Sequence, residues 1–304
     1  MFFRLETSRA FRCTFGPRIS ISKFMPPLRQ SALYSALVVC YLGIGGYSSR
    51  AADASEIVES ATAALRADWA ADLSYAFVEK DETQKGDKVA SKTFEVVMID
   101  GSDYHVPLAI DDQAVPPSRR KTELLKLKSE MQRRTNESPS ARRSRIEEWK
   151  KQRDENGELL LDFPAALTFH LQGEEIKNGH AAYVFSATPK PGVVPATRAA
   201  KVLTGIEGKA WVEKETLHPI RVECSVIKPV PVFGALASVL PGTDIDIGMT
   251  KVADSIWLID SVSMKLKVAK VRVFKSTAVT RYTYSHYRLN ASALEDLLSE
   301  ASHE

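Results

Sequence analysis

Short stretches in which apolar and polar residues alternate recur along most of the chain. A period of two is typical of strands with one buried face. The stretches are residues 73–77, 93–99, 104–110, 167–172, 181–187, 209–214, 220–226, 244–250, 257–268 and 278–287. Turn sequences such as Asn178-Gly179 lie between them. The pattern predicts a mainly β (α+β) fold, with about ten antiparallel strands in a large curled sheet or unclosed β-barrel.

Two of these stretches show which face of the sheet is apolar. Residues 220–226 alternate between an apolar and a polar set, and residues 262–268 do the same. A curled sheet of this kind either fills its concave face with a helix or leaves a cavity that suits acyl chains. The candidate lining residues are Val222, Cys224, Val226, Val262, Met264 and Leu266.

An uncharged segment between prolines, residues 230–240, follows the strand at 220–226. Phe233, Leu236 and Leu240 recur in it at helical spacing. The segment is too short to span a bilayer. We interpret it either as a lid over the mouth of the cavity or as a cap that closes the core.

Helices are predicted at both ends of the strand region. Asp53 and Glu56 form a D-x-x-E capping pattern before a short amphipathic helix that ends near Trp69. Asn290 is placed to cap a final short helix with three leucines on one side.

Residues 118–158 interrupt the strands and predict a charged helical hairpin. Leu124, Leu127 and Met131 lie at helical spacing, and Ser138-Pro139 is placed as the N-cap and first residue of a second helix. The insertion holds 13 basic and 8 acidic residues. It is either a contact for an anionic membrane surface or an acidic partner, or a solvated helix pair of mixed charge.

Residues 1–51 are predicted to be a leader. Met25 is the expected true start, Arg29 supplies a basic n-region, and residues 31–46 form an apolar stretch before a small-x-small cleavage site at Ala51. This apolar stretch is shorter than the roughly 20 residues that a membrane helix needs. We therefore expect cleavage near Ala51.

The mature chain is expected to be one exported domain, periplasmic or secreted, over residues 52–304. A lipid anchor at Cys40 is not expected, because valine precedes this cysteine where a lipoprotein signal normally has Gly or Ala. The positive net charge of the whole chain, +3, comes from the leader, which carries seven basic residues and one acidic residue. Without it the chain has a charge of −3, divided into +5 on the insertion and −8 on the rest.

Residues 208–223 read GKAWVEKETLHPIRVE. Trp211, Glu213, Pro219 and Arg221 in this segment resemble the W-[IV]-D-x-x-T-x-x-P-x-R-x-E hairpin of the LolA/LolB-like lipoprotein-carrier superfamily, with Glu213 where Asp is usual. The resemblance implies an unclosed barrel wrapped around helices, whose apolar cavity accepts lipid or acyl chains. It implies no catalytic residue.

No motif for catalysis, a cofactor or a metal ion is found. The six histidines are scattered without an H-E-x-x-H pattern, and Cys224 is the only cysteine outside the leader. We expect Cys224 to be a buried, inert thiol. Asp244 and Asp246 share a strand face, which we interpret as a solvated edge.

The leading hypothesis is therefore an exported, non-enzymatic carrier that holds a lipid or acyl chain on the apolar face. A second is an envelope scaffold with a filled core that docks through residues 118–158, and a third is a hydrolase whose site is assembled from distant residues. We expect a monomer. A nucleic-acid partner is not expected, because the basic residues lack interleaved aromatic residues.

Overall fold

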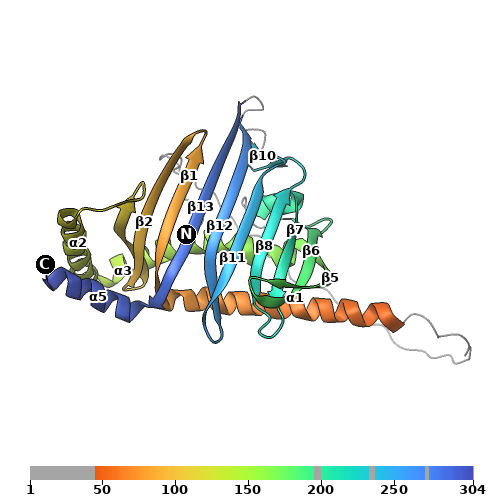
Figure 1. The fold of residues 1–304 in the computed structure, drawn as a ribbon, viewed down its shortest axis with the longest axis horizontal. Helices are drawn as coiled ribbons and strands as arrows, with labels where there is room; N and C mark the ends of the chain where they lie inside the picture. Colours follow the sequence, from red (N-terminus) through yellow and green to blue (C-terminus); the bar gives the residue numbers. More distant parts are fainter. Residues whose placement is uncertain (1–44, 195–199, 233–236, 271–273, 304) are drawn as a thin grey trace, which may run out of the picture.

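The computed structural model describes residues 45–194, 200–232, 237–270 and 274–303. Within them the strands form one 13-stranded antiparallel sheet with the order β4-β3-β2-β1-β13-β12-β11-β8-β7-β6-β5 (Figure 1). The strands are β1 (Tyr75–Lys85), β2 (Lys88–Ile99), β3 (Ser102–Ile110), β4 (Gln113–Ala114), β5 (Leu167–Lys177), β6 (His180–Pro189), β7 (Ile206–Glu213), β8 (Pro219–Val226), β9 (Val230–Pro231), β10 (Ala237–Val239), β11 (Asp244–Ala253), β12 (Ile256–Lys270) and β13 (Phe274–Leu289). Strands β4 and β5 lie at the two ends of this order and do not pair with each other, so the sheet is open and the predicted fold class is confirmed.

Five α-helices and two 3-10 helices accompany the described strands. They are α1 (Gly45–Ala71), α2 (Pro117–Thr135), α3 (Pro139–Leu161), α4 (Phe163–Ala166), α5 (Asn290–His303), η1 (Asp72–Ser74) and η2 (Ala200–Gly205). The predicted capping of the first helix at Asp53 is wrong, because α1 already begins at Gly45 and Asp53 lies inside it. Residues 45–52 contain no proline, so the helix continues through them. Cleavage near Ala51 stays a prediction.

The turn at Asn178-Gly179 shows how local sequence sets the strand register. Both residues have positive φ, 53° and 83°, as a two-residue type I′ hairpin turn requires. Asparagine and glycine tolerate this conformation better than other residues. The turn therefore fixes the pairing of Lys177 with His180 and of the following pairs as far as Gly173 with Val184, beyond which the register shifts.

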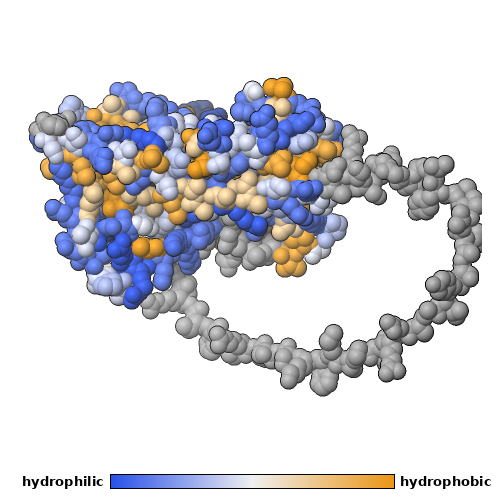
Figure 2. Space-filling model, turned by 90° about the horizontal axis from the view of Figure 1, so that it is seen from below, coloured by the Kyte–Doolittle hydropathy of each residue, from blue (hydrophilic) through white to orange (hydrophobic). Residues whose placement is uncertain are grey.

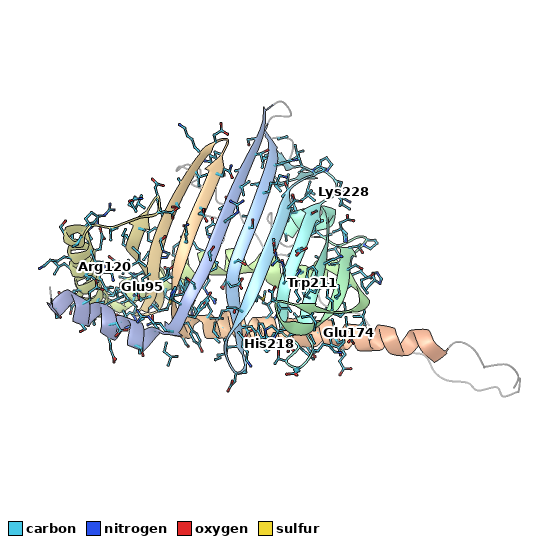
Figure 3. All side chains as sticks on the ribbon, in the orientation of Figure 1. Glu95, Arg120, Glu174, Trp211, His218 and Lys228 are labelled. Atoms are coloured by element: carbon cyan, nitrogen blue, oxygen red, sulfur yellow. The ribbon has the colours of Figure 1, made fainter. Side chains whose placement is uncertain are left out.

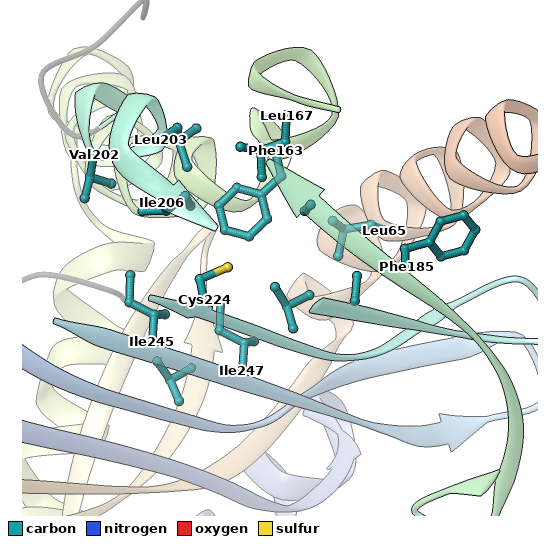
Figure 4. Packing of buried hydrophobic residues seen from close by; sticks show 14 of the residues in the cluster. Leu65, Phe163, Leu167, Phe185, Val202, Leu203, Ile206, Cys224, Ile245 and Ile247 are labelled. Atoms are coloured by element: carbon teal, nitrogen blue, oxygen red, sulfur yellow. The ribbon is translucent and has the colours of Figure 1, made fainter. Parts of the chain in front are cut away.

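The sheet has apolar clusters on both of its faces. We call inner the face that α1 and α4 cover, where the largest cluster joins Leu65 and Phe163 to Phe185, Cys224 and Ile247 (Figure 4). The opposite, outer face carries a second cluster under α2 and α5. Its buried members are Ala76, Val97, Ile99, Val106, Leu124, Leu127, Ala293 and Leu297.

The predicted helix pair is present, but it is no free arm. Helix α2 packs on β3 and α5, whereas α3 packs on β3, α1 and α4. Ser138 Oγ accepts from the Ala141 N–H at 3.2 Å, as expected of a cap. Leu124 and Leu127 are fully buried. The insertion is therefore part of the cover of the sheet.

Ion pairs hold α2 and α5 to β2. Arg120 of α2 donates to both carboxylate oxygens of Glu300 in α5, at 2.7 and 2.6 Å. Glu95 of β2 lies 3.8 Å from Arg120, next to it near α2 in Figure 3, and pairs with Arg288 of β13. The Asn290 side chain bonds the N–H and C=O of Met98, so it ties the start of α5 to β2.

Arg134, near the end of α2, is buried under the turn between β2 and β3. Its guanidinium donates to the carbonyls of Ile99 at 2.8 Å and Ser102 at 2.9 Å. It also donates to the carboxylate of Glu130, one helical turn earlier, at 2.6 Å. One side chain thus joins α2 to the backbone on both sides of this turn.

Helices α1 and α3 meet where α3 has a glycine. A Cβ on Gly157 would lie 2.4 Å from the ring of Trp69, so only glycine allows this approach. The Arg153 guanidinium lies 4.1 Å over the Trp69 ring and 3.6 Å from Asp72. These contacts fix the C-terminal end of α1.

We predict that Arg134→Ala lowers the free energy of unfolding by about 3 kcal/mol, because it removes the buried hydrogen bonds from this guanidinium to Ile99 and Ser102. The neighbouring Arg133→Ala is the matched control, since Arg133 also pairs with Glu130 but is 54% exposed. Its effect should be below about 1 kcal/mol. Urea unfolding measures both, and equal losses would contradict the role of the buried bonds.

A second prediction concerns acid stability. Hydrogen bonds from Arg133 and Arg134 lower the pKa of Glu130 from 4.5 to about 2. The ionised form is therefore favoured by folding, and its contribution is present above pH 4.5 and lost as the pH falls toward 2. The Glu130→Gln variant should lose less stability than the wild type over this range in urea unfolding at stepped pH. Parallel curves would contradict the assignment.

Candidate functional site

The apolar inner face between α1 and strands β5 to β8 is the main candidate site. A cavity of about 60 Å³ remains there. Its lining comes from α1, α4 and the four strands and includes Leu65, Phe163, Phe185, Val222 and Cys224. An apolar cavity of roughly 150 Å³ holds one benzene molecule, so this one is too small for an acyl chain as it stands. The predicted concave face is therefore largely filled by α1 and α4.

The six predicted lining residues come together on this face. Val222, Cys224, Val226, Val262 and Met264 are buried members of the inner cluster, and Leu266 packs against it. Only Val222 and Cys224 border the cavity itself. Their role in binding a ligand stays a prediction.

Cys224 is buried and has no disulfide among the described residues. Burial, with a smaller effect of the Glu223 charge, raises the pKa of its thiol to about 12. The thiol is therefore protonated at neutral pH, and a protonated buried thiol is a poor nucleophile.

The predicted lid segment contributes strands where it is described. Strand β9 pairs with β10, and β10 pairs with β12 through Val239 and Val268. Leu240 follows β10 and donates its N–H to Lys267 O at 2.9 Å. Phe233 and Leu236 lie outside the described residues. The described ends of the segment extend the sheet, as a cap on the core would, and a lid stays a prediction.

The hairpin that resembles the carrier superfamily is formed by β7 and β8. Glu213 Oε2 accepts from the Glu215 N–H at 3.0 Å and from the Thr216 N–H and hydroxyl at 2.6 and 2.7 Å. Burial opposes ionisation, but these bonds hold the pKa of Glu213 below its usual value. Glu213 thus caps the turn, and Pro219 starts β8, where it pairs with Val212.

The other two motif residues lie on the outer face of the sheet. Trp211 donates its indole N–H to Glu175 at 2.5 Å, and Lys177 lies 3.9 Å over its ring. Arg221 pairs with Glu223 and Asp246. Trp211 and Arg221 therefore stabilise the hairpin from the face opposite to the cavity, whereas Pro219 borders it.

Among the described residues, no group of histidine, cysteine and carboxylate side chains has a metal-binding arrangement. Asp246 is paired with Arg221, and Asp244 lies 3.7 Å from Lys265. The edge position expected for the two aspartates is wrong, because β11 pairs with β8 on one side and with β12 on the other, so both aspartates lie on an interior strand.

A buried polar junction that the sequence did not indicate joins α1 to the ends of two hairpins. Asp68 of α1 accepts from the backbone N–H of Trp257 at 3.2 Å, and its other oxygen lies 3.5 Å from His218 Nε2. His218 stacks on the Trp257 ring, and His180 meets that ring edge-on. His218 lies at the lower end of the sheet, close to α1 in the view of Figure 3.

This junction fixes the helix that covers the cavity. Asp68 is 3% exposed and His218 8%. Burial raises the pKa of Asp68, although the Trp257 N–H and His218 act in the opposite direction. Two histidines that are scattered in the sequence thus meet at one tryptophan. Only the long-range pairing of strands could reveal this contact, because no local spacing encodes it.

The surface seen from below, where α1 lies in Figure 1, is mainly hydrophilic with smaller apolar patches (Figure 2). Among the described residues, no helix has both the length and the apolar composition that crossing a bilayer requires.

We predict that Asp68→Ala lowers the free energy of unfolding by about 1–3 kcal/mol, because the buried backbone N–H of Trp257 loses its acceptor. Asp68→Asn keeps an acceptor oxygen and should recover most of this loss. Hydrogen exchange of the α1 amides should rise in the alanine variant and stay close to wild type in the asparagine variant. Equal exchange in both would contradict the role of this bond.

Comparison with known proteins gives only distant structural likeness. No family model and no curated protein matches the chain. Similar solved structures include a DUF1329 family protein from Desulfovibrio piger, with 15% identity, 77% of this chain and 93% of that chain covered and a TM-score of 0.32. Another is a protein domain from Vibrio parahaemolyticus assigned to outer membrane lipoprotein sorting, with 11% identity, coverage of 79% and 93% and a TM-score of 0.36.

A LolA superfamily protein from Nitrosomonas europaea is also similar, with 11% identity, coverage of 78% and 93% and a TM-score of 0.32. The superfamily that residues 208–223 resemble is thus found among the structural neighbours, as expected. Identities and TM-scores of this size carry no argument about function.

Proposed function

We propose that this chain is an exported binding protein that holds an acyl chain against the inner cluster. The observation that carries the proposal is the apolar cavity between α1, α4 and the sheet. Val222 and Cys224 are among the residues that line this cavity. In this proposal, the structure with a cavity of about 60 Å³ is the closed form of the protein, in which α1 and α4 fill most of the binding site. The acyl chain takes the place of part of the helical cover.

The proposal rests on how the cover is held. Helix α1 crosses β5, β8 and β12, and its polar anchors lie close together near one end, at Asp68 and Trp69. The preceding part of α1 contacts the sheet through apolar residues such as Val58 and Leu65. Contacts of this kind are non-directional, so an acyl chain can replace them without leaving a polar group unpaired.

The test is titration with a fluorescent fatty acid, together with mass spectrometry of the purified protein. We expect saturable binding and a retained lipid. Val222→Asp places a charge in the cavity lining and should lower the affinity at least about tenfold. Glu223→Gln, on the other face of the same strand, is the control. Absence of both retained lipid and saturable binding would refute the proposal.

The thiol of Cys224 provides a second measurement, in a Cys13→Ser, Cys40→Ser chain that leaves it as the only cysteine. Its buried, protonated state predicts slow reaction with a thiol reagent at neutral pH. A bound acyl chain should slow the reaction further, because it occupies the cavity that Cys224 borders. A rate that does not change at saturating fatty acid would contradict binding at this place.

Docking through residues 118–158 is a second candidate, because exposed basic side chains remain on both helices. Lys126 is 58% exposed and Arg142 51%, while Lys150 and Lys151 are exposed as well. Deleting the insertion would uncover the outer cluster, so charge reversal is the cleaner test. The triple change Lys126→Glu, Lys150→Glu and Lys151→Glu should abolish cosedimentation with anionic vesicles while acyl-chain binding persists. Wild-type protein that does not cosediment would exclude docking on such membranes.

A further inference from the structure

The inner face has a second, chemically different region on β1 and β13. Glu79 and Asp81 of β1 lie directly opposite Tyr284 and Tyr282 of β13. On the other side, Glu79 lies opposite Phe94 of β2. Residues directly opposite each other on antiparallel strands point to the same face. We call these five residues the acidic-aromatic patch.

The two carboxyl groups of the patch are incompletely satisfied. Glu79 is 1% exposed. Within the described part of the chain, Glu79 Oε2 and Asp81 Oδ1 are buried and have no hydrogen-bond partner outside the pair itself. A buried carboxyl oxygen without a partner is costly, and native proteins seldom keep one without a use. These two atoms therefore mark a place for a donor or a cation.

The other charged groups around the pair do not neutralise it. Asp103 of β3 adds negative charge, and His105 is engaged with it at 3.0 Å. Lys92 of β2 lies opposite Asp81, but the ion pairs of the described residues include none between them. Burial, and then the hydrogen bond and charge of Asp81, raise the pKa of Glu79 to about 9. Glu79 therefore carries a proton at neutral pH while the site is empty.

Aromatic rings surround the carboxyl groups. Phe77 meets Tyr284 edge-on with ring centroids 5.7 Å apart, and it lies 5.5 Å from Tyr287. Aromatic faces carry negative potential and attract cations, most of all alkylated ammonium groups. Asp81 and Tyr282 are only half-buried, so the patch is reached from their side.

We propose that the acidic-aromatic patch binds an organic ammonium group, with Glu79 and Asp81 as counter-charges and Tyr282, Tyr284 and Phe94 against its alkyl carbons. Binding expels the proton of Glu79 to solvent, so that both carboxylates face the cation. A free amine and the headgroup of an amine lipid share this chemistry. The proposal does not depend on the acyl-chain proposal, because the residues that line the cavity belong to α1, α4 and strands β5 to β8.

The test is isothermal titration of the full chain with choline and ethanolamine, and separately with lysophosphatidylcholine and lysophosphatidylglycerol. Free amines that bind alone identify the ammonium group as sufficient. Binding of lysophosphatidylcholine, with at least about tenfold weaker binding of lysophosphatidylglycerol, identifies a lipid headgroup as the source. At pH 7 the apparent heat should change with the ionisation heat of the buffer, because a proton is released.

The double variant Glu79→Gln, Asp81→Asn should lose at least about tenfold in affinity for the ammonium ligand and lose the buffer dependence. It keeps hydrogen-bonding groups of the same size, and circular dichroism checks its fold. Glu82→Gln, on the opposite face of β1, is the matched control and should bind like the wild type.

Two results would overturn the proposal. One is the absence of saturable binding of any amine ligand, and the other is binding that the double variant leaves unchanged. Fatty-acid binding to the double variant separates the two proposals, since the inner cluster is intact there. Loss of ammonium binding with fatty-acid binding retained assigns the two ligands to two regions of the face.

Discussion

The structure depends on covering the apolar inner face of one open sheet. A single sheet that is apolar on one side is stable in water only when another layer buries that side, at about 25 cal/mol per Å² of apolar surface. Helix α1 is the largest part of this layer, and it crosses β5, β8 and β12. Asp68 anchors it to Trp257, and Gly157 lets α3 approach it at Trp69. The volume left for a ligand is therefore set by the position of one helix.

The outer face shows the same constraint on a smaller scale. Helices α2 and α5 bury the outer sides of β1, β2 and β3, and the Arg120–Glu300 pair joins the two helices. Part of the positive charge of the insertion is consequently consumed inside the molecule. Arg120 pairs with the carboxylate of Glu300. Arg134 pairs with the carboxylate of Glu130 and donates to the backbone carbonyl of Ile99, so neither guanidinium faces a partner protein. The asymmetry of charge in the sequence thus overstates the basic surface that a partner meets.

Local patterns predicted the strands, because a period of two and turns such as Asn178-Gly179 act over a few residues. They also predicted that Cys224 faces inward. They did not predict the path of α3 or the Asp68–Trp257 bond, since these depend on which distant strands become neighbours. Strand β1 pairs with β13, about 200 residues later. Glu79 and Asp81 alternate with Lys80 and Glu82, and which distant strand lies beside each of them is not encoded in this local pattern.

The strand register places the two regions of the inner face side by side. Val262 of β12 lies opposite Tyr282 of β13, and Tyr282 lies opposite Asp81 of β1. Neighbouring strands are about 4.8 Å apart, so about 10 Å separates the backbone at Asp81 from the apolar stripe at Val262. Tyr282 joins them, with an apolar ring and a polar hydroxyl. A ligand with an ammonium group and an acyl chain can therefore contact both regions while it stays on the inner face of the sheet. The order of strands β1, β13 and β12, which no local pattern in the sequence contains, creates this adjacency.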